Sequence, residues 1–347
     1  MSIRLTRFPP LRSGNLSNES LNAYHNAQCA SGVLHKTILI TGCAGFIGKN
    51  LIIHLLKDPT VKIIGVDNLI VSECPPINDD RFHFIKWNIV EDWNMFQDLP
   101  KIDEIYHLAS IASPEKYKHY PLETLDVNVL GTRNMLKLAQ KHGARFLLTS
   151  TSEIYGDPLV HPQPESYYGN VNTVGERSCY DESKRCAETY VYEYRRLYGL
   201  DAKICRIFNT YGPHMDIDDG RIITNIIKQI IRSKPVVIYG DGKQTRSFCY
   251  VDDMVDGLVA LMASQETGPI NLGNPATECS INDLVQTFEK ILATKIITTH
   301  VERTENDPMV RRPDIRVAQR LLGFRPKIGL EKGLQKTFDY FASQQSA

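Results

Sequence analysis

Short apolar runs alternate with longer stretches of helical periodicity between residues 36 and 209. The runs are rich in β-branched residues and the longer stretches repeat apolar positions three and four residues apart, which predicts buried strands separated by helices. The predicted strands are 37–41, 62–67, 82–87, 104–110, 144–150 and 202–209, and the predicted helices are 46–57, 121–142 and 180–198. This alternation predicts an α/β fold with a doubly wound parallel sheet that helices cover on both faces.

The pattern changes after residue 209. Shorter strands at 236–240 and 247–251 and helices near 222–232, 281–292 and 330–341 predict a smaller second lobe. The strand and helix near 247–272 are expected to return to the first domain. We therefore divide the chain into a flexible tail over 1–35, a domain over 36–208 and a lobe mainly over 209–347. The two should meet at the carboxyl ends of the sheet strands, where open α/β sheets bind ligands.

Composition narrows the possible functions by exclusion. The 347 residues carry 40 basic and 40 acidic side chains, so no global field favours nucleic acid or an anionic membrane. No apolar run is long enough for a membrane span. The eight cysteines include no Cys-x-x-Cys pair, which argues against a metal site and favours reduced thiols in the cytoplasm. Arginines in the tail leave organellar targeting as the weaker alternative, because Pro9-Pro10 would break an amphipathic helix.

Three glycines follow the first predicted strand at a spacing typical of a dinucleotide site. Gly42, Gly45 and Gly48 stand between this strand and a predicted helix. Glycine lets backbone N–H groups approach a pyrophosphate, and the helix N-terminus adds partial positive charge. Asp67 ends the second strand, where a carboxylate accepts both adenosine ribose hydroxyls and repels a 2′-phosphate. This context favours NAD over NADP, and a binding site over a plain tight turn.

Tyr180 and Lys184 stand four residues apart at the start of a predicted helix, so their side chains share one face. A free tyrosine with a pKa near ~10 is a poor base at neutral pH. A nearby ammonium group and the positive nicotinamide ring both favour the phenolate. Thr151 leaves a predicted strand at the expected active-site edge and can hydrogen-bond the same substrate oxygen. Without that context, Tyr-x-x-x-Lys is equally typical of a surface helix.

The spaced glycines, the threonine and Tyr-x-x-x-Lys together resemble the extended short-chain dehydrogenase/reductase family. The resemblance extends from about Thr37 to Phe341. It is carried by HLASIASPEKY (107–117), STSEIYGDP (150–158), CYDESKRCAET (179–189), RIFNTYGP (206–213), DDGRIITNII (218–227), YGDGKQTRSFCYVDD (239–253), NLGNP (271–275) and DPMVRRPDI (307–315). It implies a Rossmann-type NAD-binding domain over 36–208 and a substrate-binding lobe mainly over 209–347.

The resemblance also implies which residues bind the two ligands. The implied NAD contacts are Gly42, Gly45, Phe46, Ile47, Gly48, Asp67, Asn68, Asn88, Ile89, Leu108, Ala109, Ser110, Tyr180 and Lys184. The implied nucleotide-sugar contacts are Tyr117, Asn209, Thr210, Arg221, Tyr239, Gln244, Arg246 and Arg311. Arginine suits bidentate contact with phosphate, although a surface ion pair is the commoner fate of arginines. Asn88 replaces the usual aspartate, which concerns the adenine contact alone.

The residues after Thr151 discriminate among members of the family. Sugar-nucleotide 4,6-dehydratases carry Asp-Glu there because a leaving hydroxyl needs an acid, and 4-epimerases usually carry a small or neutral residue in place of Glu153. Carbon dioxide leaves without a proton, so Ser152-Glu153 fits a decarboxylase best. The resemblance thus implies NAD-dependent conversion of UDP-glucuronate to UDP-xylose. The implied catalytic residues are Thr151, Ser152, Glu153, Tyr180, Lys184 and Arg311.

Alternatives of two classes stay open at this point. One is another family reaction on a nucleotide sugar, a 4-epimerisation or a 4,6-dehydration. The other is a catalytically inactive protein that binds NAD as a sensor, because fold does not determine function. The resemblance further implies a homodimer formed through helices 121–142 and 180–198, and a cytoplasmic enzyme without a membrane anchor. A role of the tail in binding nucleic acid has little support.

Asp67 provides a test of cofactor choice. NAD should bind far better than NADP, because the carboxylate repels a 2′-phosphate, and Asp67→Ala should reduce that preference by roughly tenfold. Titration of each cofactor by calorimetry measures the ratio. Equal affinity of the unmodified chain for both cofactors would contradict the assignment of Asp67.

Overall fold

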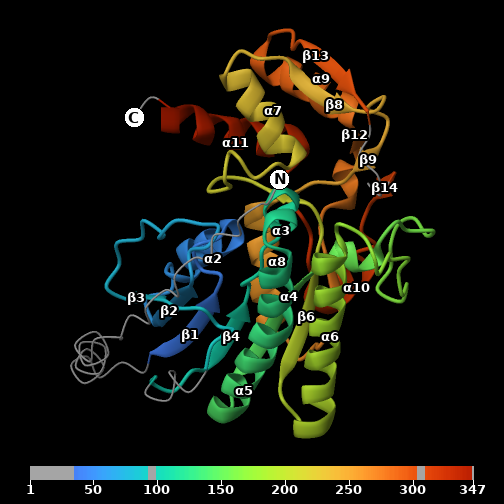
Figure 1. Cartoon of the computed structure of the whole chain (residues 1–347). Helices are drawn as coiled ribbons and strands as arrows, with labels where there is room; N and C mark the ends of the chain where they lie inside the picture. The colour runs from blue at the N-terminus through green and yellow to red at the C-terminus, as the bar shows by residue number, and fades with distance from the viewer. Residues whose placement is uncertain (1–34, 93–98, 303–308, 346–347) are drawn as a thin grey trace, which may run out of the picture.

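The computed structural model describes residues 35–92, 99–302 and 309–345. The tail expected over 1–35 lies almost wholly outside these residues. The described chain forms a parallel sheet with helices on both faces and a smaller lobe at the carboxyl ends of the strands (Figure 1). The predicted α/β, doubly wound architecture is confirmed.

The sheet has seven strands, all parallel, in the order β11-β6-β5-β4-β1-β2-β3. The strands are β1 (Lys36–Thr41), β2 (Val61–Asp67), β3 (Phe82–Lys86), β4 (Glu104–His107), β5 (Arg145–Thr151), β6 (Ala202–Ile207) and β11 (Ile270–Leu272). Two predicted strands are shorter than expected, since β4 stops at His107 and β6 at Ile207. β11 comes from the second half of the chain and pairs with β6 as an edge strand.

Alternation of side chains between two covered faces explains why the strands are mostly apolar on both faces. On β1, Ile38 and Ile40 join the core beneath α2 and α8, whereas Leu39 joins the core beneath α5 and α6. A parallel sheet covered on both faces needs apolar residues at every position. The covering helices are α2 (Phe46–Leu55), α8 (Val251–Ala263) and α10 (Arg316–Leu322) on one face, and α5 (Thr132–His142) and α6 (Ser178–Tyr198) on the other.

The helix predicted over 121–142 is interrupted. It comprises α4 (Pro121–Asp126), one π-helical turn, η2 (Val127–Gly131), and α5. The periodicity could not reveal the turn, because a π turn adds one residue without breaking the helix. Asn128 in this turn donates to Ser183 Oγ of α6 at 2.9 Å, which joins the two neighbouring helices. The other predicted helix ends shift by a few residues, for example from 57 to Leu55 in α2.

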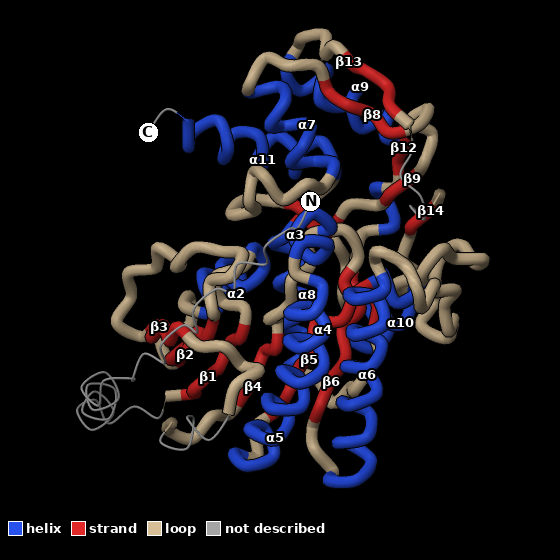
Figure 2. The backbone as a smooth tube through the Cα atoms, viewed as in Figure 1, coloured by secondary structure: helices blue, strands red, loops and turns tan. Residues whose placement is uncertain are grey.

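The second lobe is built around α7 (Ile222–Ile231), α9 (Ile281–Leu292) and α11 (Leu330–Gln345), with β8 (Val236–Tyr239) parallel to β13 (Thr298–Val301). Very short strands link it to the sheet domain (Figure 2). These are β7 (Thr210–Tyr211), β9 (Thr245–Arg246), β10 (Cys249–Tyr250), β12 (Cys279–Ser280) and β14 (Val310–Arg311). The run at 247–251 therefore forms a strand over two residues only. The sequence analysis missed α3 (Pro114–His119) and α10, both short.

A buried ion pair joins four elements near the carboxyl end of the sheet. Arg206 of β6 donates to both carboxylate oxygens of Glu188 on α6, at 3.0 and 2.8 Å. Ser150 of β5 donates to Glu188 Oε1 at 2.5 Å. Arg206 Nη1 also donates to Tyr155 Oη, which donates in turn to Asn271 of β11. Because every charged atom has a partner, this network fixes the strand ends that carry the site.

Arg206→Met should lower the free energy of unfolding by about 3–5 kcal/mol, because it leaves the carboxylate of Glu188 buried without its cation. Arg196→Met removes an exposed pair with Glu193 and should change the free energy by about 0.5 kcal/mol or less. Urea unfolding of both variants gives the comparison. Similar losses for the two arginines would show that the network contributes no more than a surface ion pair.

Candidate functional site

A single cavity of about 2120 Å³ lies between the carboxyl edge of the sheet and the second lobe. All residues that the sequence analysis singled out for cofactor, substrate or catalysis line it. Its volume is about twice the upper end of the roughly 300–1,000 Å³ typical of a site for one small molecule. The cavity therefore has room for two nucleotides side by side.

The turn between β1 and α2 is built so that only glycine fits at its two ends. Gly42 has φ +69°, and a Cβ atom there would lie 2.6 Å from Ala109 N. A Cβ atom on Gly48 would lie 2.4 Å from Gly42 O. Gly45 caps α2 without any side-chain hydrogen bond, so the first N–H groups of the helix face the cavity edge uncapped by a side chain. This cradle fits a pyrophosphate group.

Asp67 lies beside that turn. Its carboxylate accepts hydrogen bonds from Ala44 N at 3.1 Å and Leu69 N at 2.9 Å, and burial raises its pKa. Asn88 Oδ1 accepts from Val90 N at 3.2 Å, which orders the segment after β3. Ser110 Oγ, at the end of β4, is buried and has no hydrogen-bond partner within the described part of the chain. An acceptor of ribose hydroxyls and a spare hydroxyl thus flank the cradle, and both fit a dinucleotide.

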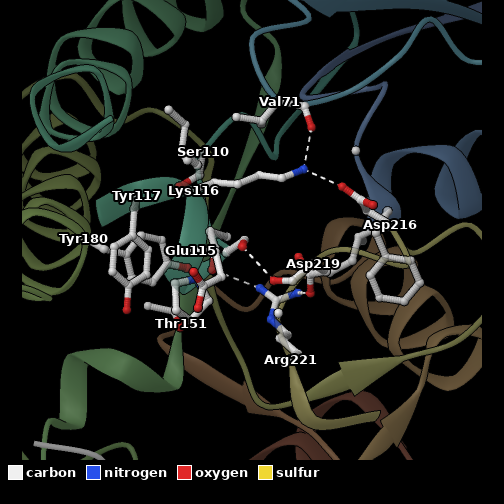
Figure 3. Close-up of a pocket in the computed structure, with 18 of the residues that line it drawn as sticks. Val71, Ser110, Glu115, Lys116, Tyr117, Thr151, Tyr180, Asp216, Asp219 and Arg221 are labelled. Carbon is white, nitrogen blue, oxygen red and sulfur yellow. Dashed lines mark hydrogen bonds and ion pairs between the residues drawn. The ribbon is translucent and has the colours of Figure 1, made fainter. Parts of the chain in front are cut away.

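Tyr180, Lys184 and Thr151 meet at the centre of the cavity. The Tyr180 ring stacks on that of Tyr117, with centroids 5.4 Å apart and planes 7° apart (Figure 3). Lys184 Nζ lies 6.0 Å from the Tyr180 ring centroid and donates to Thr149 O at 2.9 Å. The stack restricts Tyr180, and the bond to Thr149 O restricts Lys184. The two side chains of α6 are therefore held in fixed positions next to the end of β5.

Burial of Tyr180 and Lys184 opposes the ionisation that the sequence analysis expected of Tyr180. Burial raises the pKa of Tyr180 to about 12, although Thr151 and Arg221 act to lower it. Burial also lowers the pKa of Lys184 to about 7, so its positive charge is itself weakened at neutral pH. The sequence analysis counted the ammonium group and the nicotinamide ring but not the burial of both side chains. The positive nicotinamide ring would act against the effect of burial and favour the phenolate.

The residues after Thr151 form a short 3-10 turn, η3 (Ser152–Tyr155), that Arg311 holds in place. Arg311 is 2% exposed and reaches across from β14 in the second lobe. Its Nη1 donates to Ser152 O, and its Nη2 donates to Gly156 O at 2.9 Å. The two hydrogen bonds of its guanidinium group therefore go to the backbone of the turn, a role that the sequence analysis had not considered.

Glu153 is clamped between two guanidinium groups. Arg177 Nη2 donates to Glu153 Oε2, and Arg311 Nη1 lies 3.4 Å from Glu153 Oε1. Burial acts to raise the pKa of Glu153, but Arg311, Arg177 and Arg246 outweigh it and hold the pKa at about 2. Glu153 is thus an anion at any pH at which the protein would work.

The remaining predicted substrate residues line the wall that the second lobe contributes. Arg221 donates to Ala112 O at 3.0 Å and pairs with Asp219 at 3.1 Å. Other contacts are Arg246 Nη1 to Thr245 O at 2.8 Å, Gln244 Nε2 to Tyr239 O at 2.9 Å, and Thr210 Oγ1 to Phe208 O at 2.8 Å. Cys249 N donates to Asn209 O. Asp307 and Pro308 of the last motif lie outside the described residues.

Among the charged residues that the sequence analysis missed are two that act electrostatically on Glu153 or Tyr180. Arg177 precedes α6 by one residue, and Asp181 follows Tyr180. Asp181 is 6% exposed, and its Oδ1 has no hydrogen-bond partner in the described structure. Burial raises the pKa of Asp181 to about 7, and the negative charge of Glu153 adds to the effect. The sequence shows an acidic residue between Tyr180 and Lys184, which could have indicated a further site residue. The spacing alone could not show that this residue is buried.

Residues 38–273 match the model of the NAD dependent epimerase/dehydratase family, and the chain belongs to this family. NAD is therefore its cofactor, in agreement with the cradle and with Asp67. Within the described residues, no group of three or more His, Cys, Asp or Glu side chains is placed to hold a metal ion. Of the described helices, none is both long and apolar enough to cross a membrane.

Individual relatives narrow the similarity further. UDP-glucuronic acid decarboxylase 5 of Arabidopsis thaliana is 49% identical over 301 residues, which cover 86% of each chain. UDP-glucuronic acid decarboxylase 1 of Xenopus tropicalis is 43% identical over 341 residues, 96% of this chain and 79% of the relative. The structure of UDP-glucuronic acid 4-epimerase from Bacillus cereus with UDP-glucuronic acid and NAD is 29% identical, with a TM-score of 0.79. It covers 89% of this chain and 99% of the epimerase.

Asp181 makes the stability of the site dependent on pH. A carboxyl pKa raised to about 7 means that the folded state holds the proton more tightly than the unfolded state, whose pKa is near ~3.9. This stability is therefore present at low pH and is lost as the pH rises from about 4 through about 7. Asp181→Asn stays neutral throughout, so its melting temperature should exceed that of the unmodified chain by about 2–4 °C more at pH 8 than at pH 5.

Thermal melting at both pH values measures this difference, with Asp218→Asn as the control on an exposed aspartate of a neighbouring loop. A gain for Asp181→Asn of the same size at both pH values would mean that Asp181 is ionised in the folded protein.

Proposed function

We propose that this chain converts UDP-glucuronate to UDP-xylose and carbon dioxide, using NAD that is regenerated in each cycle. Relatives named UDP-glucuronic acid decarboxylase in a plant and in an animal support the proposal, since each covers most of the chain. The similar epimerase structure holds UDP-glucuronic acid together with NAD, and the cavity of this chain has room for two such ligands.

The observation that carries the proposal in this chain is the chemical state of the residues after Thr151. A 4,6-dehydratase must protonate a leaving hydroxyl group. Ser152 offers only a buried hydroxyl at this position, and Glu153 is held as an anion with a pKa of about 2. Neither can serve as that acid at neutral pH. Carbon dioxide needs no such proton, because its bonding electrons stay behind on the sugar.

Oxidation at C4 comes first. When bound, NAD supplies the acceptor and later the donor of two electrons at C4. Tyr180 takes the proton of the 4-hydroxyl group, and Thr151, which acts to lower the pKa of Tyr180, contacts the same oxygen. Lys184 keeps its ammonium group next to the tyrosine through its bond to Thr149 O. The residual positive charge of Lys184 favours the phenolate form of Tyr180.

Loss of the carboxylate follows, because a 4-keto uronate is a β-keto acid. The electrons of the broken bond move to the C4 oxygen, where Tyr180 and Thr151 hold the enolate. Glu153 places a fixed negative charge beside the sugar carboxylate and so disfavours the ground state. Arg311 acts chiefly by holding the turn that carries Glu153. Attraction of Arg311 to the sugar carboxylate would stabilise the ground state, so any direct benefit must come from orienting the carboxylate.

One proton must then be added at C5. Glu153 and Asp181 are two carboxyl groups in one cavity whose environments separate their pKa values, to about 2 and about 7. Such a pair divides into a permanent anion and a proton carrier. Asp181 is the member that carries a proton near neutral pH, and water restores this proton after each turnover. Protonation at C5 and reduction at C4 then complete UDP-xylose.

The ligands divide between the two parts of the chain. Residues 36–208 hold NAD through the glycine cradle, Asp67 and the ends of β3 and β4, with β11 and α8 completing this domain. Residues 209–347 hold the nucleotide sugar, with Arg221 and Arg246 at the diphosphate and Tyr239 and Gln244 at the uridine. Arginine side chains with anchored guanidinium groups suit this task because the protein as a whole is neutral.

The assembly proposed is a cytoplasmic homodimer. The helical column of α4, η2 and α5 lies side by side with α6 (Figure 1). Exposed apolar residues lie on these helices, namely Leu122 on α4 and Tyr192, Leu197 and Tyr198 on α6. Pairing with a second copy would cover them. The described cysteines are all free thiols, as suits a reducing compartment. Light scattering on a sizing column tests the dimer.

A 4-epimerase is the second candidate, because the similar solved structure that binds the same substrate is one. The two reactions differ in mass, since decarboxylation alone removes carbon dioxide. A catalytically inactive NAD-binding protein is disfavoured by the meeting of Thr151, Tyr180 and Lys184 in one cavity. Incubation with UDP-glucuronate, followed by chromatographic separation and mass spectrometry of the products, separates all three, because the epimerised sugar has the mass of the substrate and only its retention differs.

The purified chain should release UDP-xylose and carbon dioxide from UDP-glucuronate, and Glu153→Gln should lower the rate at least roughly a hundredfold while cofactor binding persists. Glu278→Gln is the matched control, because Glu278 also pairs with an arginine but lies outside the cavity. UDP-galacturonate as the sole product would replace the proposal by epimerisation. Unchanged turnover in Glu153→Gln would remove Glu153 from the mechanism.

A further inference from the structure

Three segments far apart in the sequence are joined by one side chain in the cavity wall. Lys116 of α3 donates from Nζ to Val71 O at 2.9 Å and to Asp216 Oδ2 at 2.5 Å (Figure 3). Val71 belongs to the segment that follows Asp67 at the end of β2, and Asp216 belongs to the segment between β7 and α7. All three residues line the cavity. We call this contact the Lys116 bridge.

The segment that carries Asp216 is hydrogen-bonded both to the region of α3 and to α2. Toward α3, Ser113 Oγ donates to Asp219 O at 2.7 Å, and Arg221 Nη2 donates to Ala112 O at 3.0 Å. Toward α2, Asn50 Nδ2 donates to Pro213 O at 3.0 Å. The segment thus links the helix that opens at the glycine cradle with the helix beside Tyr180. The Lys116 bridge adds the Asp67 side of the cavity to this connection.

The Lys116 bridge is partly exposed to water, so it can break and form again. The side chains of Lys116 and Asp216 are 25% and 45% exposed, so water can compete for both charges. Such a pair is worth about 1 kcal/mol or less, against several for a buried pair. The bonds of Arg206 and Glu188 hold the fold, whereas the Lys116 bridge is weak enough to break during ligand exchange.

We propose that Lys116 is a positioning residue that retains the reduced cofactor between oxidation and re-reduction of the sugar. The requirement rests on the proposed function, in which the same cofactor must stay bound while the carboxylate is lost and C5 is protonated. Escape in that interval would end the cycle with a 4-keto sugar in solution. Lys116 opposes escape by fastening the segment after Asp67 to the second lobe.

The first experiment measures cofactor dissociation without any sugar. Lys116→Met and Asp216→Asn are loaded with reduced cofactor and chased with excess NAD, and the loss of bound-cofactor fluorescence is followed. Dissociation should accelerate roughly fivefold in each variant, the equivalent of about 1 kcal/mol. The double variant should be no faster than either single variant, because either substitution interrupts the same connection from Val71 through Lys116 to Asp216. Lys116→Arg, which keeps a donor cation, should stay close to the unmodified chain.

Lys228→Met is the matched control. Lys228 pairs with Asp218 of the same segment at 3.2 Å, but neither residue lines the cavity. It should leave dissociation unchanged even if it loosens the segment. Equal acceleration in Lys228→Met and Lys116→Met, or additive effects of Lys116→Met and Asp216→Asn, would overturn the retention role in favour of general loosening.

The second experiment measures partition during turnover of UDP-glucuronate. Lys116→Met should release a larger share of 4-keto product, matched by free reduced cofactor, while the rate of carbon dioxide release changes little. An unchanged product ratio despite faster dissociation would also overturn the retention role. The unmodified chain could leave UDP-glucuronate intact while the chase still shows faster dissociation in Lys116→Met. In that case the proposed function would be wrong, and Lys116 would still be a residue that retains the cofactor.

Discussion

A buried guanidinium group from the second lobe determines the geometry at the reacting end of the cavity. Arg311 comes from β14, yet its hydrogen bonds go to Ser152 O and Gly156 O at the end of β5, in the other part of the molecule. A cation with 2% exposure must find acceptors, because an unmatched buried charge is several kcal/mol unfavourable. The second lobe must therefore pack on the sheet domain in a position that lets Arg311 reach these acceptors.

The same constraint explains how a protein without net charge handles two anionic ligands. Positive charge is gathered locally, with Arg246 next to Arg311 across paired strands β9 and β14 and with Arg177 opposite them. Glu153 compensates part of this charge and becomes a fixed anion. Burial and the negative charge of Glu153 raise the pKa of Asp181, whose Oδ1 has no hydrogen-bond partner in the described residues. The arginines keep Glu153 ionised, and the charge of Glu153 in turn helps to raise the pKa of Asp181.

Sequence patterns predicted what depends on local chemistry. The apolar runs predicted the parallel sheet, and the turn glycines predicted a cradle in which Cβ atoms at Gly42 and Gly48 would strike the backbone. Motifs also located the residues that line the cavity. They could not reveal what each side chain contacts once it is there. The burial that raises the pKa of Tyr180, the contacts of Arg311 with the turn and the three-way contact of Lys116 all depend on segments distant in the sequence.

The stack of Tyr117 on Tyr180 has a consequence for the energetics of proton transfer. With the ring planes 7° apart, the stack restricts rotation of the Tyr180 ring. A proton can then be transferred with little movement of the ring itself. The heavy atoms that receive the developing charge are already in position, so the reorganisation energy that a mobile base in water would require is largely spent when the chain folds.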